Sequence, residues 1–242
     1  MNTFFTFVRN QHQTINLMFT QITAFVQPFV VAIILLIYIK YRFKINSWKL
    51  IFKALLFGIG TIFFMLIFDL IASQMGYDML GNLKRSTFYS FVVIGFGAEV
   101  GKFILLRYYF LRQRTFKGPL DGIIYSMLIS LGFTMIALPL FTLGIFSRAV
   151  DPQILYTYTI ANMAFAVVLG FFTGMGKFRK NRFIDSMTGL GAASFFHGFY
   201  YFINLTDEFL IFSLYGFGLI MIALLFIVKA VNLEKNDGTP QL

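Results

Sequence analysis

Five polar or ionisable residues lie within long apolar stretches of this sequence, and their chemistry is the first clue to function. They are Asp69, Glu99, Lys102, Asn162 and His197. An ionisable side chain in hydrocarbon is costly unless it is paired or hydrated, so such residues mark a functional site by default. A carboxylate, an ammonium and an imidazole together supply a proton acceptor and groups that stabilise developing negative charge, which are the requirements of hydrolysis.

Glu99 and Lys102 are three residues apart, which places them on one helix face and within reach of each other. One interpretation is an ion pair that merely neutralises itself. The other is a carboxylate held in a chosen protonation state by the neighbouring ammonium. The spacing predicts the contact and leaves both interpretations open.

Two stripes of small residues predict which way His197 and Asn162 face. At steps of four residues, one stripe runs through Gly189, Ala193, His197 and Tyr201, and the other through Asn162, Ala166, Gly170 and Gly174. Small residues on a stripe let another helix approach closely. We therefore expect His197 and Asn162 to face protein and to converge with Glu99 in the outer half of the membrane, with Asp69 nearer the outer surface.

The supply of metal ligands is small. The chain has no cysteine and only two histidines, His12 and His197, which excludes disulfides, zinc–cysteine sites, thiol nucleophiles and a histidine-rich site. Glu99 and His197 would give two protein ligands, whereas catalytic zinc sites use three. We expect no metal and no other cofactor.

Composition identifies the elements that must position these residues. Of 242 residues, 58% are hydrophobic and 12% are charged, whereas an average soluble domain has about 25% charged residues. The mean hydropathy is +0.78. These values exclude a soluble globular domain, a disordered chain and a coiled coil, and they indicate an integral membrane protein in a lipid bilayer.

Seven apolar stretches are long enough to span a membrane, which takes ~20 residues as a helix. They cover about 15–39, 50–73, 87–110, 119–146, 153–176, 183–204 and 207–229. This pattern predicts an all-α, polytopic transmembrane bundle that forms a single domain over residues 1–242. Asp121 is expected to cap the start of the fourth helix. Glycines in the helices are expected to be packing positions, namely Gly58, Gly60, Gly95, Gly97, Gly101, Gly132, Gly216 and Gly218.

Basic residues alternate between the two sides of this predicted bundle. Fifteen of the twenty lie at 40–53, 107–117, 177–182 and 229–235, whereas four lie on the opposite side. Because Lys and Arg collect in cytoplasmic loops, the N-terminus is predicted outside and the C-terminus in the cytoplasm. The net charge of +10 is thus a topology signal, and we expect no nucleic-acid partner because no basic domain is present.

Four segments, read in order, resemble the PrsW family of intramembrane proteases. Residues 98–102, Ala-Glu-Val-Gly-Lys, resemble its Glu-Glu-x-x-Lys motif. Residues 121–125 with 131–133 resemble the next block, Asp-Gly-Ile-x-Tyr-Gly followed by Gly-Leu-Gly-Phe. The segment 162–174 matches the spacing of a block that normally begins with His, and 197–201 resembles the last block, His-Gly-x-x-Asp/Asn. The resemblance covers about 95–205.

The resemblance implies a glutamic-type protease in the bacterial cytoplasmic membrane, related to the CAAX-type proteases, that cuts a membrane-anchored protein near the outer face. It implies that Glu99 is the general base and that Lys102 or His197 is the electrophile. Asn162, Tyr201 and Asp69 are then candidate substrate-binding residues. The partner would be a transmembrane protein substrate.

The departures from the family pattern leave catalysis open. Ala98 and Ala137 stand where glutamates are expected, Asn162 replaces the first histidine, and Tyr201 replaces the acid or amide after the last one. One alternative is a catalytically inactive pseudoprotease that binds or scaffolds a transmembrane partner. Another is a small transporter, which would show inverted repeats and broken helices, and the two halves of the sequence show no convincing repeat.

Overall fold

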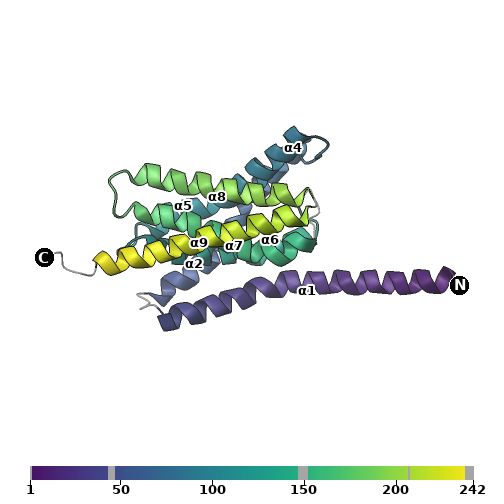
Figure 1. The fold of residues 1–242 in the computed structure, drawn as a ribbon, viewed down its shortest axis with the longest axis horizontal. Helices are drawn as coiled ribbons and strands as arrows, with labels where there is room; N and C mark the ends of the chain where they lie inside the picture. The colour runs from purple at the N-terminus through teal and green to yellow at the C-terminus, as the bar shows by residue number, and fades with distance from the viewer. Residues whose placement is uncertain (1, 43–46, 147–151, 207, 238–242) are drawn as a thin grey trace.

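The computed structural model describes residues 2–42, 47–146, 152–206 and 208–237, and these residues form helices and connecting turns without a strand (Figure 1). The elements are α1 (Asn2–Arg42), α2 (Trp48–Gly60), α3 (Ile62–Gln74), α4 (Leu83–Phe88), η1 (Tyr89–Phe96), α5 (Gly97–Leu105), η2 (Leu106–Phe110), α6 (Pro119–Thr142), α7 (Pro152–Met175), α8 (Arg182–Asn204) and α9 (Phe209–Asp237). Parts of the predicted loop 40–53 and of the segment 147–152 between the fourth and fifth predicted helices lie outside the described residues.

These elements make seven helices of membrane-spanning length in the described chain, because α2 continues into α3 and α4 continues through η1 and α5 to η2. Six are long and apolar enough to cross a membrane, namely Gln21–Arg42, Trp48–Gln74, Leu83–Phe110, Pro119–Thr142, Gln153–Met175 and Phe209–Lys235. The seventh, α8, has the length but is less apolar, because it carries buried polar residues such as Asp185, Ser186 and His197. The predicted all-α polytopic membrane bundle is confirmed. One correction concerns α8: among the described residues, six of the seven long helices, and not all seven, are apolar enough to cross a membrane.

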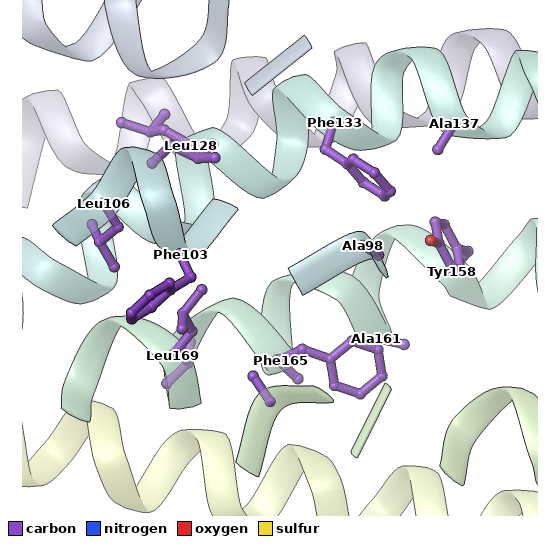
Figure 2. Packing of buried hydrophobic residues seen from close by; sticks show 14 of the residues in the cluster. Ala98, Phe103, Leu106, Leu128, Phe133, Ala137, Tyr158, Ala161, Phe165 and Leu169 are labelled. Carbon is purple, nitrogen blue, oxygen red and sulfur yellow. The ribbon is translucent and has the colours of Figure 1, made fainter. Parts of the chain in front are cut away.

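The core lies between α5, α6, α7 and α8. The helices α6 and α7 pack along each other, α8 packs on α7 and η1, and α2 packs on α6. Figure 2 shows buried residues of this core, such as Phe133 on α6 and Phe165 on α7. In Figure 1, α1 runs along one side of the bundle and its N-terminal part projects past the other helices. The charged and polar candidates on α5, α7 and α8 are therefore held by the most buried helices.

Close helix approach depends on glycine at particular positions. A Cβ atom on Gly170 of α7 would lie 2.7 Å from the Cα of Ile123 on α6 and would also collide with the carbonyl of Gly122. On α8, a Cβ atom on Gly198 would lie 2.7 Å from the Cα of Phe91 in η1. The predicted packing role is confirmed for Gly58, Gly95, Gly97, Gly101 and Gly132, and it is wrong for Gly60, Gly216 and Gly218, which have no atom within 4 Å of such a Cβ.

The helix that carries Glu99 is not regular. It is wound as a π-helix over Tyr89–Phe96 and again over Leu106–Phe110, with the α-helical α5 between them. A π-turn widens the helix, and such turns are frequent at functional sites. The regular helix predicted over 87–110 is thus corrected to a composite one that begins at Leu83.

Asp121 contributes to the start of α6, although it is not the N-cap residue. The helix begins with Pro119 after the N-cap Gly118. The Asp121 carboxylate accepts a hydrogen bond of 2.6 Å from the backbone N–H of Lys117. The predicted structural role is confirmed, and its position is corrected to the first turn of the helix, where a carboxylate suits the helix dipole.

Candidate active site

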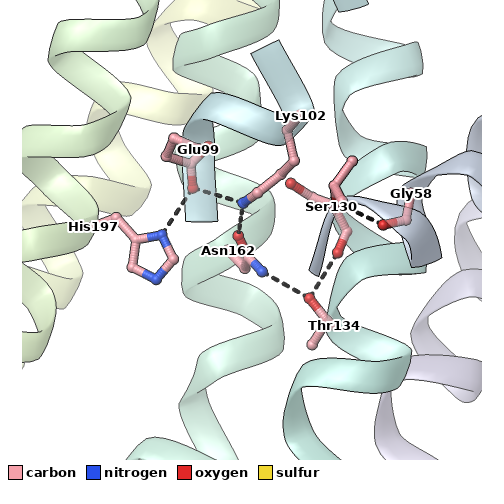
Figure 3. Close-up of polar contacts among 8 residues, drawn as sticks. Gly58, Glu99, Lys102, Ser130, Thr134, Asn162 and His197 are labelled. Carbon is pink, nitrogen blue, oxygen red and sulfur yellow. Dashed lines mark hydrogen bonds and ion pairs between the residues drawn. The ribbon is translucent and has the colours of Figure 1, made fainter. Parts of the chain in front are cut away.

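Four helices together place five polar side chains at one point in the core. Glu99 and Lys102 come from α5, Asn162 from α7, His197 from α8 and Thr134 from α6. All five residues are 0% exposed. The convergence predicted for Glu99, Asn162 and His197 is confirmed, and Lys102 lies at its centre (Figure 3).

One carboxylate oxygen of Glu99 joins two of these side chains. Its Oε1 accepts a hydrogen bond of 2.6 Å from Lys102 Nζ, and Nδ1 of His197 lies 2.8 Å from the same atom. An ionised carboxylate can only accept hydrogen bonds, so Nδ1 carries the proton in this contact. Glu99 thereby fixes both the orientation and the tautomer of the His197 ring.

The Lys102 ammonium has further partners on two other helices. Its Nζ donates a second hydrogen bond of 2.6 Å to Asn162 Oδ1 and lies 4.7 Å from the ring centroid of Phe133. Asn162 Nδ2 donates in turn to Thr134 Oγ1 at 2.8 Å. A buried charge is tolerated when it is paired and hydrogen-bonded, and Lys102 meets both conditions.

Two atoms of the cluster are buried proton acceptors to which no described residue hydrogen-bonds. They are Oε2 of Glu99 and Nε2 of His197. The His197 ring is held on one side by the ring of Phe165, stacked at a centroid distance of 4.6 Å, and the ring of Tyr158 lies 5.5 Å away. These two acceptors are the atoms through which the cluster can take a proton from water.

Asp69 and Tyr201 belong to a second cluster, around Tyr89. The Tyr89 hydroxyl donates to Asp69 Oδ1 at 2.5 Å, and the rings of Tyr89 and Tyr201 lie 6.0 Å apart. Asp69 and Tyr201 are 4% and 3% exposed. Their substrate-binding roles stay predictions, because this cluster shows how they are packed but not what they bind.

The sequence analysis missed residues that complete the first cluster. Thr134 follows the Leu-Gly-Phe segment at 131–133 directly, and Tyr158 lies four residues before Asn162 on the same helix face. Both are fully buried hydroxyl-bearing residues. Their helical spacing from the motif residues is a usable signal, although neither residue is charged and neither belongs to one of the two small-residue stripes.

Comparison with known proteins agrees with the motifs. Residues 46–230 match the family described as PrsW family intramembrane metalloprotease. The chain belongs to the PrsW family. It is 26% identical over 234 residues to Protease PrsW of Geobacillus kaustophilus, an alignment that covers 93% of this chain and 96% of that protein. No solved structure matches the chain. The predicted family is confirmed. The prediction of a multi-pass integral membrane protein is also confirmed, and the bacterial relative supports the predicted location in the cytoplasmic membrane.

The metal in the PrsW family description does not fit the donor set of this chain. In the ranges that the structure describes, no three His, Asp or Glu side chains are grouped to hold a metal ion. Glu99 and His197 supply two donors, and the Lys102 ammonium lies 2.6 Å from the carboxylate oxygen that would bind the ion. Asn162, at the position of the family's first histidine, uses its oxygen to accept from Lys102. The donor set therefore does not support a metal-dependent step.

Proposed function

We propose that this PrsW-family protein is an intramembrane endopeptidase that cuts a membrane-anchored protein near the outward-facing side of the cytoplasmic membrane. The observation that carries the proposal is the contact of 2.8 Å between Glu99 Oε1 and His197 Nδ1, which leaves Oε2 and Nε2 as buried acceptors. A positioned carboxylate or imidazole can act as general acid or base, and here the two groups are in contact.

In the proposed reaction, Glu99 acts as general base through Oε2. It removes a proton from a water molecule while the water oxygen attacks the scissile carbonyl carbon. The positive charge of Lys102 stabilises the negative charge that develops on the carbonyl oxygen. The carbon–nitrogen bond then breaks, and the leaving amine takes up the proton, either from Glu99 or by way of Nε2 of His197.

Access to the cluster requires helix movement. The side chains of Glu99, Lys102 and His197 are 0% exposed, so water and an unwound peptide reach them only when neighbouring helices separate.

A second candidate function is recognition of a transmembrane partner without cleavage. It is favoured by Ala98 and Ala137, which are 0% exposed at positions where the family pattern has glutamates and which offer no proton-transfer chemistry. In this case the cluster of Glu99, Lys102 and His197 is a buried structural link between helices, and its charges are already balanced.

Cleavage assays with a Glu99 variant separate the two candidates. The wild type and Glu99→Gln are co-expressed with a library of single-span membrane proteins that carry a cleavable reporter. For a general base, Glu99→Gln lowers cleavage by roughly 10²–10⁴-fold. The control Asp185→Asn changes a buried carboxylate that pairs with Arg179 outside the cluster, and it is expected to retain cleavage.

Cleavage that survives Glu99→Gln would exclude Glu99 as the base. Absence of cleavage by the wild type, together with capture of the same membrane partner by the wild type and by Glu99→Gln, would support the second candidate.

A further inference from the structure

A basic cavity lies at one end of the bundle, on the side that the charge pattern predicts to be cytoplasmic. It has a volume of about 400 Å³ and lies where η2 meets the turn between α7 and α8. Four of its seven lining residues are basic, and none is acidic; the basic ones are Arg107, Arg112, Lys177 and Arg182. We propose that this cavity binds the phosphate headgroup of an anionic phospholipid.

No carboxylate lines the cavity, although Lys177 also interacts electrostatically with Asp121 on α6. In the described part of the chain, none of the four cations forms an ion pair, and the nearby Asp185 is paired with Arg179 at 3.2 Å instead. Like charges that share one cavity repel each other, and an anion in the cavity removes that cost. Arginine forks match the oxygens of a phosphate group in geometry as well as in charge.

The two arginines on the η2 side are held in place. Arg107 Nη1 donates to the backbone carbonyl of Arg182 at 2.8 Å and also to the hydroxyl of Ser186. The guanidinium groups of Arg107 and Arg112 each lie 5.7 Å from the ring centroid of Tyr108. A site whose charges are already positioned loses less entropy when it binds a ligand.

The position of the cavity favours a lipid over a soluble anion. It lies at the ends of two candidate membrane spans, Leu83–Phe110 and Gln153–Met175, which is the level of the headgroups. Phe183 and Ile184, next to Arg182, are 62% and 60% exposed and offer an apolar surface to an acyl chain. Basic pockets between transmembrane helices on the cytoplasmic side are known to bind anionic headgroups. This inference does not depend on whether Glu99 catalyses hydrolysis.

Native mass spectrometry of the full chain in neutral detergent tests the proposal. The protein is titrated with phosphatidylglycerol and with phosphatidylcholine, and the phosphatidylglycerol titration is repeated in the presence of millimolar inorganic phosphate. The site variant is Arg112→Gln with Lys177→Gln, and the matched control is Lys84→Gln with Arg85→Gln, which removes two basic residues from α4 instead. Arg112→Lys keeps the charge and checks that charge is what matters.

We expect the wild type and the control to prefer phosphatidylglycerol, and the site variant to bind it about tenfold or more weakly, since each basic residue contributes to attraction of an anionic lipid. Arg112→Lys should retain most of the binding. Equal binding of the two lipids by the wild type, or unchanged phosphatidylglycerol binding by the site variant, would overturn the proposal. Displacement of the lipid by inorganic phosphate would also overturn it and indicate a soluble phosphate compound as the ligand.

Discussion

Replacing Glu99 by Gln removes a negative charge while keeping the shape of the side chain, so it measures the cost of leaving the buried Lys102 ammonium without its counter-charge. In the wild type, Lys102 Nζ lies 2.6 Å from Glu99 Oε1, and both side chains are 0% exposed. The variant leaves the ammonium with neutral acceptors, including Asn162 Oδ1 at 2.6 Å, and with the face of Phe133. The charge is then hydrogen-bonded but no longer balanced.

The expected loss is large because the remaining charge is buried. Removing one partner of a buried ion pair costs about 3–5 kcal/mol. Since Lys102 keeps neutral acceptors, we take the lower end, about 3 kcal/mol. For a chain of this size, 1 kcal/mol corresponds to about 2–4 °C in Tm. Glu99→Gln is therefore expected to lower Tm by about 6–12 °C in detergent.

A second substitution tests whether the unbalanced charge is the cause. Lys102→Met, added to Glu99→Gln, removes the ammonium and keeps an apolar side chain of similar length. Asn162 then loses the donor to its Oδ1, which costs about 1–3 kcal/mol, so the recovery is partial. We expect the double variant to melt about 3–6 °C above the single variant, which corresponds to recovery of about half of the loss.

An ion pair with one solvent-exposed partner provides the control for this series. Arg179 pairs with Asp185 at 3.2 Å, and the Arg179 side chain is 62% exposed. A pair whose cation is exposed to water contributes about 1 kcal/mol or less, so Arg179→Gln should change Tm less than Glu99→Gln does. A double variant that is no more stable than Glu99→Gln alone, or a single variant as stable as the wild type, would refute the reasoning.

Three further predictions concern topology, helix packing and a buried hydroxyl. Because the chain has no native cysteine, Lys180→Cys in intact cells should react with an impermeant thiol reagent only after permeabilisation, whereas Gly81→Cys should react at once; the reverse pattern would invert the predicted orientation. Gly170→Ala places a Cβ atom 2.7 Å from a backbone atom of α6 and should cost about 1–3 kcal/mol, whereas Gly191→Ala, with no atom within 4 Å, should keep or raise Tm; similar melting of the two variants would contradict the close packing. Tyr158→Phe removes a buried hydroxyl that has no hydrogen-bond partner among the described residues, so Tm should stay the same or rise, and a clear fall in Tm would show that the hydroxyl does have a stabilising partner.

The number and order of the helices could be predicted from the sequence, because apolar length and loop charge are properties of composition. Their internal irregularities could not. The break between α2 and α3 falls at Thr61, whose hydroxyl donates a hydrogen bond of 2.6 Å to the carbonyl of Gly58. Such a bond, like the π-turns before Glu99, depends on local geometry. A hydropathy value averaged over a window of residues does not contain that geometry. The low hydropathy of α8 also has a physical reason, since a helix buried by protein need not be apolar on every face.

The candidate site was predictable along a helix and less so between helices. The three-residue spacing predicted the contact of Glu99 with Lys102, and the stripes predicted that His197 and Asn162 face inward. The choice of Asn162 as the acceptor for Lys102, and of Thr134 as the next partner, depends on how α6 and α7 are rotated against each other. That rotation follows from close backbone packing at Gly122 and Gly170. The sequence pattern of one helix carries no information on how a second helix packs against it.

The departures from the family pattern have one common consequence, which is that the buried cluster carries no net charge when His197 is neutral. A second carboxylate beside Glu99, at the position of Ala98, would need a further proton or cation in a cluster that is 0% exposed. This chain has one carboxylate, one ammonium and an amide that accepts from the ammonium, so the cluster is neutral when His197 is neutral. The cluster is thus balanced without a second carboxylate, and Oε2 of Glu99 and Nε2 of His197 have no hydrogen-bond partner among the described residues. A purely structural ion pair has no need of two buried acceptors without hydrogen-bond partners, which is why we place proteolysis ahead of simple partner binding.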